Sequence, residues 1–365
     1  MIRLFVYEYL TGGGIDPELA GESGIADLSV LIVEGRAMRD AMVQDLRDLG
    51  GIDVSFASSR FEAAAASRSP LQHYCAAPGE PMMEFVARAA REHDYAWIVA
   101  PECDGLMLQL ADAVGAARWL GCTKVAIALC SSKRQTAALL ATHGIAVTPA
   151  LDAEGMALDG TAASRRDVNA DGAAGWVVKP DDGAGGLDTY RFDNFAEARA
   201  DFTGRLAAGR KPVLQEWVNG DALSLSLICS ATCNELISIN RQRIGVADTP
   251  AAGHAGRVIE FDGVDVDCID QGSAQGRTLA ALAQRVTAAL PGLRGFVGID
   301  VVWRPDGEPV VIEVNPRVTM AYVGLSARLK RNLAAQVLAA HGVKIAPATA
   351  DDALHAPVFA GRAAS

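Results

Sequence analysis

The sequence predicts an α/β domain followed by a region with paired strands, and three observations indicate this. Apolar strands and amphipathic helices alternate over the first third of the chain, which is typical of a parallel sheet covered by helices. The second half carries paired apolar strands separated by short turns. With 365 residues, half of them apolar, the chain is long enough to bury the cores of two or three domains.

The N-terminal third is expected to contain three strands and three helices. Runs of apolar residues predict the strands, and apolar side chains at helical spacing predict the helices. Residues 29–33 fit either a strand or the entry to the first helix. The expected strands are residues 2–7, 52–56 and 96–100, and the expected helices are residues 36–49, 82–93 and 106–120.

Acidic residues follow two of these strands. Glu8 stands after the first strand, before a stretch of three glycines that lacks the G-x-G-x-x-G pattern and is better explained as a flexible loop over a substrate cleft. Glu8 itself fits either a substrate amine or a capping role. Glu102 and Asp104 follow the third strand, at the edge where open α/β sheets bind ligands, although N-capping explains Asp104 equally well.

Two lysines stand beside features suited to phosphate. Lys133 lies in the first turn of a helix expected to run to residue 143, with Ser131 as N-cap, and a solvated lysine is the alternative. Lys179 closes the apolar strand G-W-V-V-K-P, and a glycine-rich loop follows at residues 181–186. Such a loop lets backbone N–H groups approach phosphate, although a glycine-rich hairpin without a ligand has the same pattern.

The elements that follow are expected to alternate less regularly. Residues 150–174 are polar and predict a loop or lobe insertion. Arg241 and Arg243 close one later strand, where they either meet an acidic ligand or are solvated. The expected strands are residues 187–192, 212–218, 223–229, 235–240 and 257–261, and the expected helices are residues 194–207, 278–290 and 325–340.

A predicted hairpin near the end of the chain combines three oxygen-bearing side chains. Two apolar runs, residues 296–303 and 309–314, flank a P-D-G turn. Glu313 and Asn315 lie two apart and so share one face of a strand, which Asp300 can reach from the other strand. Two carboxylates and an amide oxygen suit Mg²⁺, whereas ordinary strand-end turn residues are the alternative.

The overall charge argues against nucleic acid or an anionic membrane as the main partner. The net charge is −11, and Lys and Arg form no long run. No apolar run is long enough to span a membrane, and the acidic start is unlike a signal peptide. Seven cysteines without a C-x-x-C pair suggest reduced, mostly buried thiols. We expect a soluble, cytoplasmic protein, and the sequence leaves a homo-oligomer open.

The order of these features resembles the ATP-grasp superfamily over residues 1–340. The features are Lys133, Lys179 with its glycine-rich loop, the segment Q-E-W-V, and the acids of the late hairpin. In such enzymes ATP lies between two α+β lobes that follow an α/β domain. The resemblance implies an N-terminal substrate domain at residues 1–125, a small lobe at 126–212, a large lobe with the metal site at 213–345, and a tail at 346–365.

The likeness also implies a role for each residue toward ATP. Lys133 and Lys179 would contact the α- and β-phosphates, and the loop of Gly183, Gly185 and Gly186 would close over the β- and γ-phosphates. The residues that would face adenine and ribose are Gln215, Glu216, Trp217, Val218 and Asp221, with Ala222 as the alternative to the last.

The metal and the transferred group would have residues of their own. Asp300, Glu313 and Asn315 would bind Mg²⁺, with Mn²⁺ as an alternative, and Arg317 would hold the γ-phosphate or the acyl group. Some ligases carry an arginine two residues before the first metal acid. That position is Gly298 here, so the resemblance leaves Arg241 or Arg294 to supply the charge.

Three short segments carry a finer resemblance within the family. F-V-Y-E-Y-L-T-G-G-G, A-P-E-C-D-G and I-N-R-Q are similar to glutamate ligases of methanofuran and methylofuran biosynthesis. The likeness implies ATP-dependent amide formation through an acyl phosphate, from L-glutamate and either tyramine or tyrosine, with Glu8 and Glu102 near the substrates. The alternatives are another amino-acid or peptide ligase, similar to D-alanine ligases, and a nucleotide-binding protein without turnover.

Overall fold

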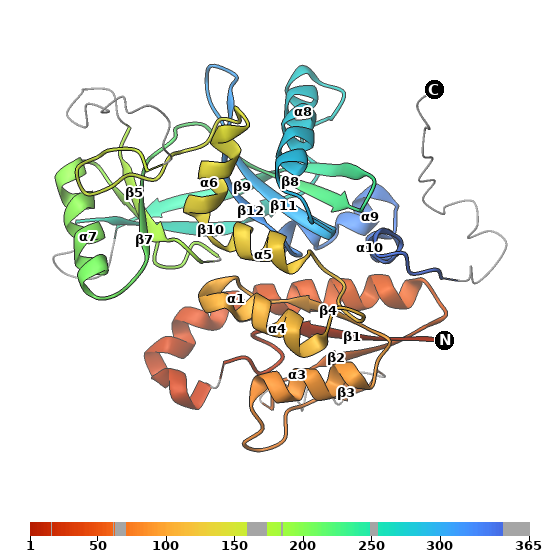
Figure 1. Ribbon diagram of the computed structural model, residues 1–365. Coiled ribbons are helices and arrows are strands. Elements are labelled where there is room, and N and C mark those ends of the chain that lie inside the picture. Colours follow the sequence, from red (N-terminus) through yellow and green to blue (C-terminus); the bar gives the residue numbers. More distant parts are fainter. Residues whose placement is uncertain are drawn as a thin grey trace.

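A computed structural model describes residues 1–15, 17–60, 62, 71–158, 174–183, 185–248 and 255–345, with the backbone alone at 17–28. Its N-terminal unit holds parallel strands and the helices that cover them (Figure 1). The elements are β1 (Ile2–Glu8), α1 (Pro17–Asp48), β2 (Ile52–Ala57), β3 (His73–Tyr74), α3 (Met82–Arg91), β4 (Tyr95–Val99), η1 (Cys103–Gly105) and α4 (Leu106–Val114). The strand order β3-β2-β1-β4 confirms the predicted parallel sheet.

The rest of the chain builds one large antiparallel sheet with helices around it. Its strand order is β12-β11-β8-β9-β10-β6-β5-β7. The elements are α5 (Lys124–Ser131), α6 (Lys133–Thr142), β5 (Trp176–Pro180), β6 (Tyr190–Phe192), α7 (Phe195–Ala207), β7 (Pro212–Glu216), β8 (Asp221–Cys229), β9 (Asn234–Ala247), β10 (Arg257–Asp265), α8 (Ala274–Ala289), β11 (Gly295–Trp303), β12 (Pro309–Asn315), η2 (Met320–Tyr322), α9 (Leu325–Leu329) and α10 (Leu333–Ala340).

Strand β1 shows why the N-terminal unit has three layers. Its side chains alternate between two faces, and both faces are buried. Leu4 and Val6 belong to the apolar cluster that includes Met42 of α1. Phe5 belongs to the other cluster, which includes Phe85 of α3. A strand with an apolar centre therefore lies between helices on both sides, as its sequence predicts.

Strand β11 uses the same alternation to separate core from site. Val297, Ile299 and Val301 are buried with the apolar side chains of α8. Asp300 comes between them and so points to the opposite face. The alternation of this strand therefore turns a carboxylate away from the core while its neighbours hold the sheet in place.

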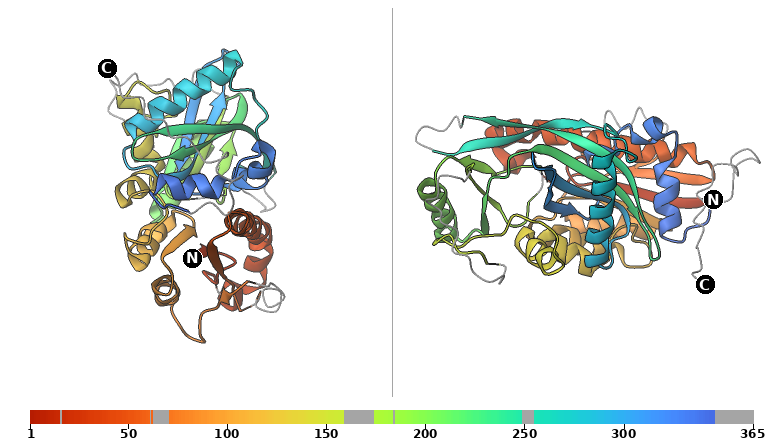
Figure 2. Two further views of the ribbon diagram at one scale, coloured as in Figure 1. Left: turned by 90° about the vertical axis from the view of Figure 1, so that its right-hand side faces the viewer. Right: turned by 90° about the horizontal axis from the view of Figure 1, so that it is seen from above.

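Asp45 on α1 joins the two units. Its carboxylate accepts hydrogen bonds from the hydroxyls of Tyr322, at 2.6 Å, and Ser326, while its backbone carbonyl accepts one from the Asn332 amide at 2.7 Å. Leu338 of α10 packs in the same apolar cluster as α1. Figure 2 shows α10 between the N-terminal unit and the large sheet. The C-terminal helices thus fix the position of the first domain.

Several element boundaries differ from the predictions. Helix α1 begins at Pro17, so residues 29–33 are helical and the strand alternative is wrong. The helix expected over 106–120 ends at Val114, because Gly115 leaves the helical region with a φ of 82°. The helix expected over 325–340 is two helices, since Lys330 adopts a φ of 52° and Asn332 caps a new helix.

Smaller differences affect the residues around the site. Ser132, not Ser131, is the N-cap of α6, and its hydroxyl accepts the Gln135 N–H. Strand β6 covers only Tyr190–Phe192, because Asp188 takes a φ of 55°. The seven cysteines are free thiols, but only three are buried, and Cys233 and Cys268 are exposed.

Other predictions lie partly outside the described residues. Residues 159–173 of the predicted insertion and the tail from residue 346 belong to that part of the chain. Within the described residues, no helix has the length and hydrophobicity needed to cross a membrane.

We predict that Tyr322→Phe lowers the free energy of unfolding by about 1–3 kcal/mol, because it removes a donor from the buried side of Asp45. Denaturant titration measures the change. Tyr95→Phe is the matched control, since its hydroxyl has no hydrogen bond to any described residue, and it should stay within about 0.5 kcal/mol of wild type. Equal effects of the two variants would contradict the bridging role of Asp45.

Candidate functional site

A cavity of about 890 Å³ lies between the N-terminal unit and the large sheet. Both units contribute to its wall. Among the residues that the sequence marked for a site, Glu102, Arg243 and Arg294 do not line this cavity. Those that do include Glu8, Lys133, Lys179, Gly183, Gly185, Gly186, Gln215, Glu216, Trp217, Val218, Asp221, Arg241, Asp300, Glu313, Asn315 and Arg317. The fold therefore gathers residues that are far apart along the chain into one space.

The acids of the late hairpin face each other across its two strands. Asp300 on β11 is the direct partner of Glu313 on β12, and a bulge follows immediately. The Asn315 amide donates to Asp300 Oδ2 at 3.1 Å, and the Gln242 amide donates to Oδ1 at 3.1 Å. Burial and the adjacent Glu313 raise the pKa of Asp300 well above its usual range.

Two lysines approach these acids, Lys133 from α6 and Lys179 from β5. Lys133 Nζ lies 3.3 Å from Glu313 Oε2. Burial lowers the pKa of Lys179 to about 8, and the Glu313 carboxylate acts against this shift. Burial alone would raise the pKa of Glu313, but Lys133 and Lys179 outweigh it and bring that pKa to about 2. Glu313 is therefore the acid that holds the negative charge facing the lysines.

Asp181 holds Lys133 in place. Its carboxylate accepts hydrogen bonds from the Ser132 hydroxyl at 2.8 Å and the Arg134 N–H at 2.9 Å. Its carbonyl accepts the Lys133 N–H at 3.0 Å. An acid at a helix N-terminus is favourable because it meets unpaired N–H groups and the positive end of the helix dipole. The strand that ends in Lys179 thus also positions the other lysine, a connection that the sequence analysis missed.

The glycine-rich loop lies against Lys133. The ammonium of Lys133 donates to the Gly183 carbonyl at 2.8 Å. Gly185 and Gly186 have φ angles of 69° and 71°, which residues with a side chain rarely adopt. Ala184 lies outside the described residues. The glycines therefore allow a backbone turn that brings the loop close to the lysine pair.

The segment from Gln215 to Val218 forms another wall of the cavity. Gln215 is buried, and its amide donates to the Thr148 carbonyl at 2.6 Å. The Trp217 N–H donates to the Gly175 carbonyl at 2.9 Å. These bonds fix the chain as it passes from β7 toward β8, where Asp221 lies 3.7 Å from Arg241.

Arg317 forms a buried ion pair with Glu102 across the two units. Its Nε and Nη2 atoms donate to the two Glu102 carboxylate oxygens at 2.9 Å and 3.2 Å. Glu102 is 4% exposed and does not line the cavity, whereas Arg317 does. The structure thus places Glu102 behind Arg317, so its carboxylate orients the arginine and does not itself face the cavity.

The two alternative arginines lie in different places. Arg241 lines the cavity, whereas Arg294 donates to the Ala340 carbonyl at 3.1 Å and is absent from the described wall. Gly298 is a glycine for a steric reason, because a Cβ atom there would lie 2.9 Å from Thr319 Cγ2. Position 298 has no room for a side chain, and only Arg241 of the two arginines reaches the cavity.

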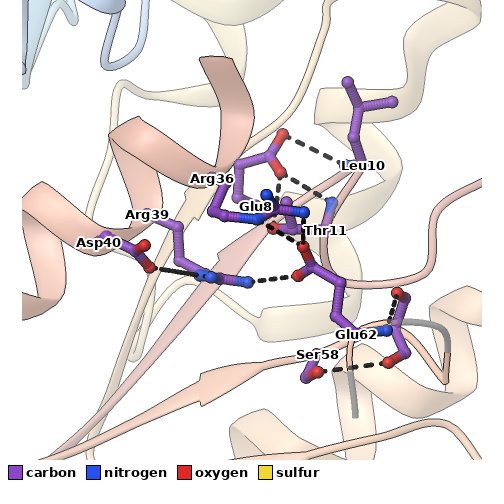
Figure 3. Close-up of polar contacts among 9 residues, drawn as sticks. Glu8, Leu10, Thr11, Arg36, Arg39, Asp40, Ser58 and Glu62 are labelled. Atoms are coloured by element: carbon purple, nitrogen blue, oxygen red, sulfur yellow. Dashed lines mark hydrogen bonds and ion pairs between the residues drawn. The ribbon is translucent and has the colours of Figure 1, made fainter. Parts of the chain in front are cut away.

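Glu8 accepts hydrogen bonds from the loop that follows it (Figure 3). Its carboxylate accepts the Thr11 N–H at 2.9 Å, the Thr11 hydroxyl at 2.8 Å and the Leu10 N–H at 3.2 Å. Beside it, Glu62 accepts hydrogen bonds from Arg36 and Arg39, each at 2.7 Å. The capping alternative for Glu8 is therefore what the structure shows, and the loop is tied down by hydrogen bonds.

The donor set of the hairpin fits a hard divalent cation. Asp300 and Glu313 are paired directly, and the Asn315 side chain lies beside Asp300, to which its NH2 group donates. Carboxylate and amide oxygens are the kind of ligands that Mg²⁺ takes together with water and phosphate oxygens. Such ligands suit a divalent cation that is also bound by the oxygens of an anionic ligand such as phosphate.

Comparison with known proteins defines the class. The chain matches the ATP-grasp domain over residues 130–321 and the pre ATP-grasp 3 domain over residues 54–127. The first match alone spans more than half of the chain, so this protein belongs to the ATP-grasp family. The resemblance seen in the sequence is confirmed, and so is the fold that it implied.

Within that family, a curated relative is the tyramine–L-glutamate ligase of Methanocaldococcus jannaschii. It is 27% identical over 234 residues, which are 64% of this chain and 58% of the relative. The chain thus matches little more than half of that enzyme's length.

Two solved structures share the fold. An ATP-grasp superfamily protein from Archaeoglobus fulgidus aligns with a TM-score of 0.62 at 20% identity, over 94% of this chain and 89% of that one. The D-alanine–D-alanine ligase of Bacillus anthracis aligns with a TM-score of 0.60 at 13% identity, over 93% and 97%. At these identities the likeness shows the fold alone.

We predict that Glu102→Gln lowers the free energy of unfolding by about 3–5 kcal/mol, because it leaves the buried Arg317 without its counter-charge. The control is Glu235→Gln, which breaks a solvent-exposed pair with Arg331 and should cost less than about 1 kcal/mol. Calorimetric or denaturant unfolding compares the two. A cost for Glu102→Gln as small as that of the control would show that the buried pair is not coupled.

Proposed function

We propose that this protein is an ATP-dependent carboxylate–amine ligase that joins L-glutamate to tyramine or tyrosine. The observation that carries the proposal is a cluster of two paired acids and two lysines, one of them bonded to the glycine-rich loop, in the wall of a cavity shared with a second domain. Membership of the ATP-grasp family and the 27% identical glutamate ligase support the same chemistry.

In this proposal the triphosphate of ATP lies between the glycine-rich loop and the hairpin. Lys133 and Lys179 contact the α- and β-phosphates, and Gly183, Gly185 and Gly186 offer backbone N–H groups to the β- and γ-phosphates. Adenine lies against Gln215 to Val218, and Asp221 faces the ribose hydroxyls. The bond that Lys133 makes to the Gly183 carbonyl would be exchanged for phosphate oxygens.

Charge explains why this arrangement requires Mg²⁺. Two lysines already face two acids, so a triphosphate added to the cluster would meet the acids without a surplus of positive charge. Asp300, Glu313 and Asn315 would hold the cation, which would screen this repulsion and polarise the phosphate oxygens. Mn²⁺ has a similar preference for oxygen ligands.

The reaction proceeds in two displacements. An oxygen of the substrate carboxylate forms a bond to the γ-phosphorus, the bond from that phosphorus to the β–γ bridging oxygen breaks, and ADP leaves. The amine nitrogen then bonds to the acyl carbon, the carbon–oxygen bond to phosphate breaks, and the nitrogen loses a proton. Arg317, held by Glu102, faces the transferred group, and Arg241 lies on the same wall. Burial of the site limits hydrolysis of the acyl phosphate.

Two other functions fit the fold. A ligase that joins two amino acids would use the same phosphoryl chemistry, and the D-alanine–D-alanine ligase neighbour shares the fold with this chain. A nucleotide-binding protein without turnover is the other alternative. The intact set of Asp300, Glu313 and Asn315 favours catalysis over it, because these residues supply the oxygen ligands that a catalytic Mg²⁺ would need.

We predict phosphate release that depends on ATP, L-glutamate and an amine together. A colorimetric phosphate assay pairs glutamate with tyramine, tyrosine and common amino acids, and mass spectrometry identifies the amide. Glu313→Ala is the matched control and should lower turnover by about three orders of magnitude or more, with a smaller effect on ATP affinity. Release with no amine or carboxylate dependence, or wild-type turnover by Glu313→Ala, would contradict the proposal.

A further inference from the structure

The cations that line the cavity all lie on one side of it, where they face the acids Glu216, Asp221, Asp300 and Glu313. These cations, Lys133, Lys179, Arg241 and Arg317, belong to the ATP-grasp side. The described lining residues between 8 and 109 include no Lys, Arg or His, and they carry the acids Glu8, Glu34 and Asp104. The N-terminal wall is therefore suited to a cationic group and unsuited to a second anion.

Two of these three acids already have partners in the protein or in solvent. Glu8 is saturated by the hydrogen bonds of Thr11 and Leu10. Asp104 is exposed, so water solvates its carboxylate, and its backbone N–H donates to Asp182 at 2.9 Å. The carboxylates of Glu8 and Asp104 therefore need no hydrogen bond or counter-charge from a ligand.

Glu34 on α1 differs from both. It is half-buried, and it makes no hydrogen bond or ion pair with any described residue. Burial raises the pKa of its carboxyl group. A carboxylate that has lost part of its water without gaining a partner is unfavourable, and a ligand cation would remove that cost.

The surroundings of Glu34 describe the rest of the ligand. Leu31, Glu34, Gly35 and Met38 follow helical spacing, so one face of α1 lines the cavity with a carboxylate between apolar side chains. Tyr9, Leu10 and Leu106 add further apolar surface. The ligand that fits this wall therefore has its cationic group attached to an apolar or aromatic group.

Helix α1 also reaches the phosphate end of the cavity. A Cβ atom on Gly185 would lie 3.1 Å from Leu31 Cδ2, so the helix passes beside the glycine-rich loop. A Cβ on Gly35 would lie 2.5 Å from Glu8 Oε2, so only glycine lets α1 pack this closely against the first loop. Glu34 therefore lies on a wall that is fixed next to the proposed site of phosphoryl transfer.

We propose that Glu34 binds the ammonium group of the amine substrate and selects an arylalkylamine. This inference rests on the proposed ligase function and deepens it, because it assigns the amine to the N-terminal wall. Tyramine fits the wall, since it joins a primary ammonium to an aromatic ring. Tyrosine does not, because its α-carboxylate would face Glu34 and Glu8 without a cation among the described lining residues of that wall.

Calorimetric titration of the full chain, loaded with Mg²⁺ and a non-hydrolysable ATP analogue, tests the assignment. The probes are tyramine, tyrosine and 4-(2-hydroxyethyl)phenol, the neutral isostere of tyramine. Glu34→Gln should raise the Kd of tyramine by about 10- to 100-fold, because it removes a charge-assisted hydrogen bond. It should leave the Kd of the neutral isostere and of the nucleotide unchanged. Asp48→Asn, an exposed acid near the end of the same helix, is the matched control and should match wild type.

Two results would overturn the inference. One is a tyramine Kd in Glu34→Gln within about twofold of wild type, and the other is an equal loss of tyramine and isostere binding, which would indicate a role in packing. The ligase proposal is judged separately by phosphate release. Glu34-dependent tyramine binding without turnover would keep this inference and reject the ligase, whereas turnover with unchanged tyramine KM in Glu34→Gln would do the reverse.

Discussion

The rest of the site depends on the attraction between two lysines and a directly paired couple of acids, Asp300 and Glu313. Asp300 and Glu313 meet because the hairpin pairs them directly, and a buried pair of carboxylates is unfavourable on its own. Lys133 and Lys179 come from a different helix and strand, and their ammonium groups keep Glu313 ionised. The two sides hold each other in place, so the free protein presents a preformed cluster in which anionic phosphate can replace some of the internal contacts.

The two units of the chain are locked together at the same place. Arg317 on the large sheet pairs with Glu102 at the end of β4, and Asp182 beside the glycine-rich loop accepts the Asp104 N–H. Each contact includes a residue that lines the cavity, Arg317 in one and Asp104 in the other. The geometry of the cavity near the glycine-rich loop therefore depends on the position of the N-terminal unit. In the proposed reaction, the N-terminal unit would in this way help to set where the amine meets the transferred group.

Local patterns in the sequence predicted much of the fold. Alternating strands and helices indicated the parallel sheet, and period-two alternation placed Asp300, Glu313 and Asn315 on one face. Helix ends were less predictable: α4 stops at Gly115 and the C-terminal helix breaks at Lys330, because single residues with positive φ decide these points. Propensity averaged over a window does not register such a residue.

Contacts between distant parts of the chain could not be predicted in the same way. The ordered set of lysines, glycines and acids pointed to one site, but nothing near Glu102 in sequence indicates a partner 215 residues away. Gln242 looked like an ordinary strand residue until the structure placed its amide on Asp300. Glu8 and Glu34 have similar local surroundings of apolar residues, and only the fold shows that Thr11 satisfies the first and no described residue satisfies the second.

A crystal structure of the chain with Mg²⁺ and a non-hydrolysable ATP analogue tests the central claim most directly. We expect cation density between the triphosphate and the oxygens of Asp300, Glu313 and Asn315. Lys133 and Lys179 should contact the phosphates, and the hydrogen bond from Lys133 to the Gly183 carbonyl should be replaced by one to a phosphate oxygen. A triphosphate bound elsewhere, with the acids still facing the lysines and no cation between them, would contradict it.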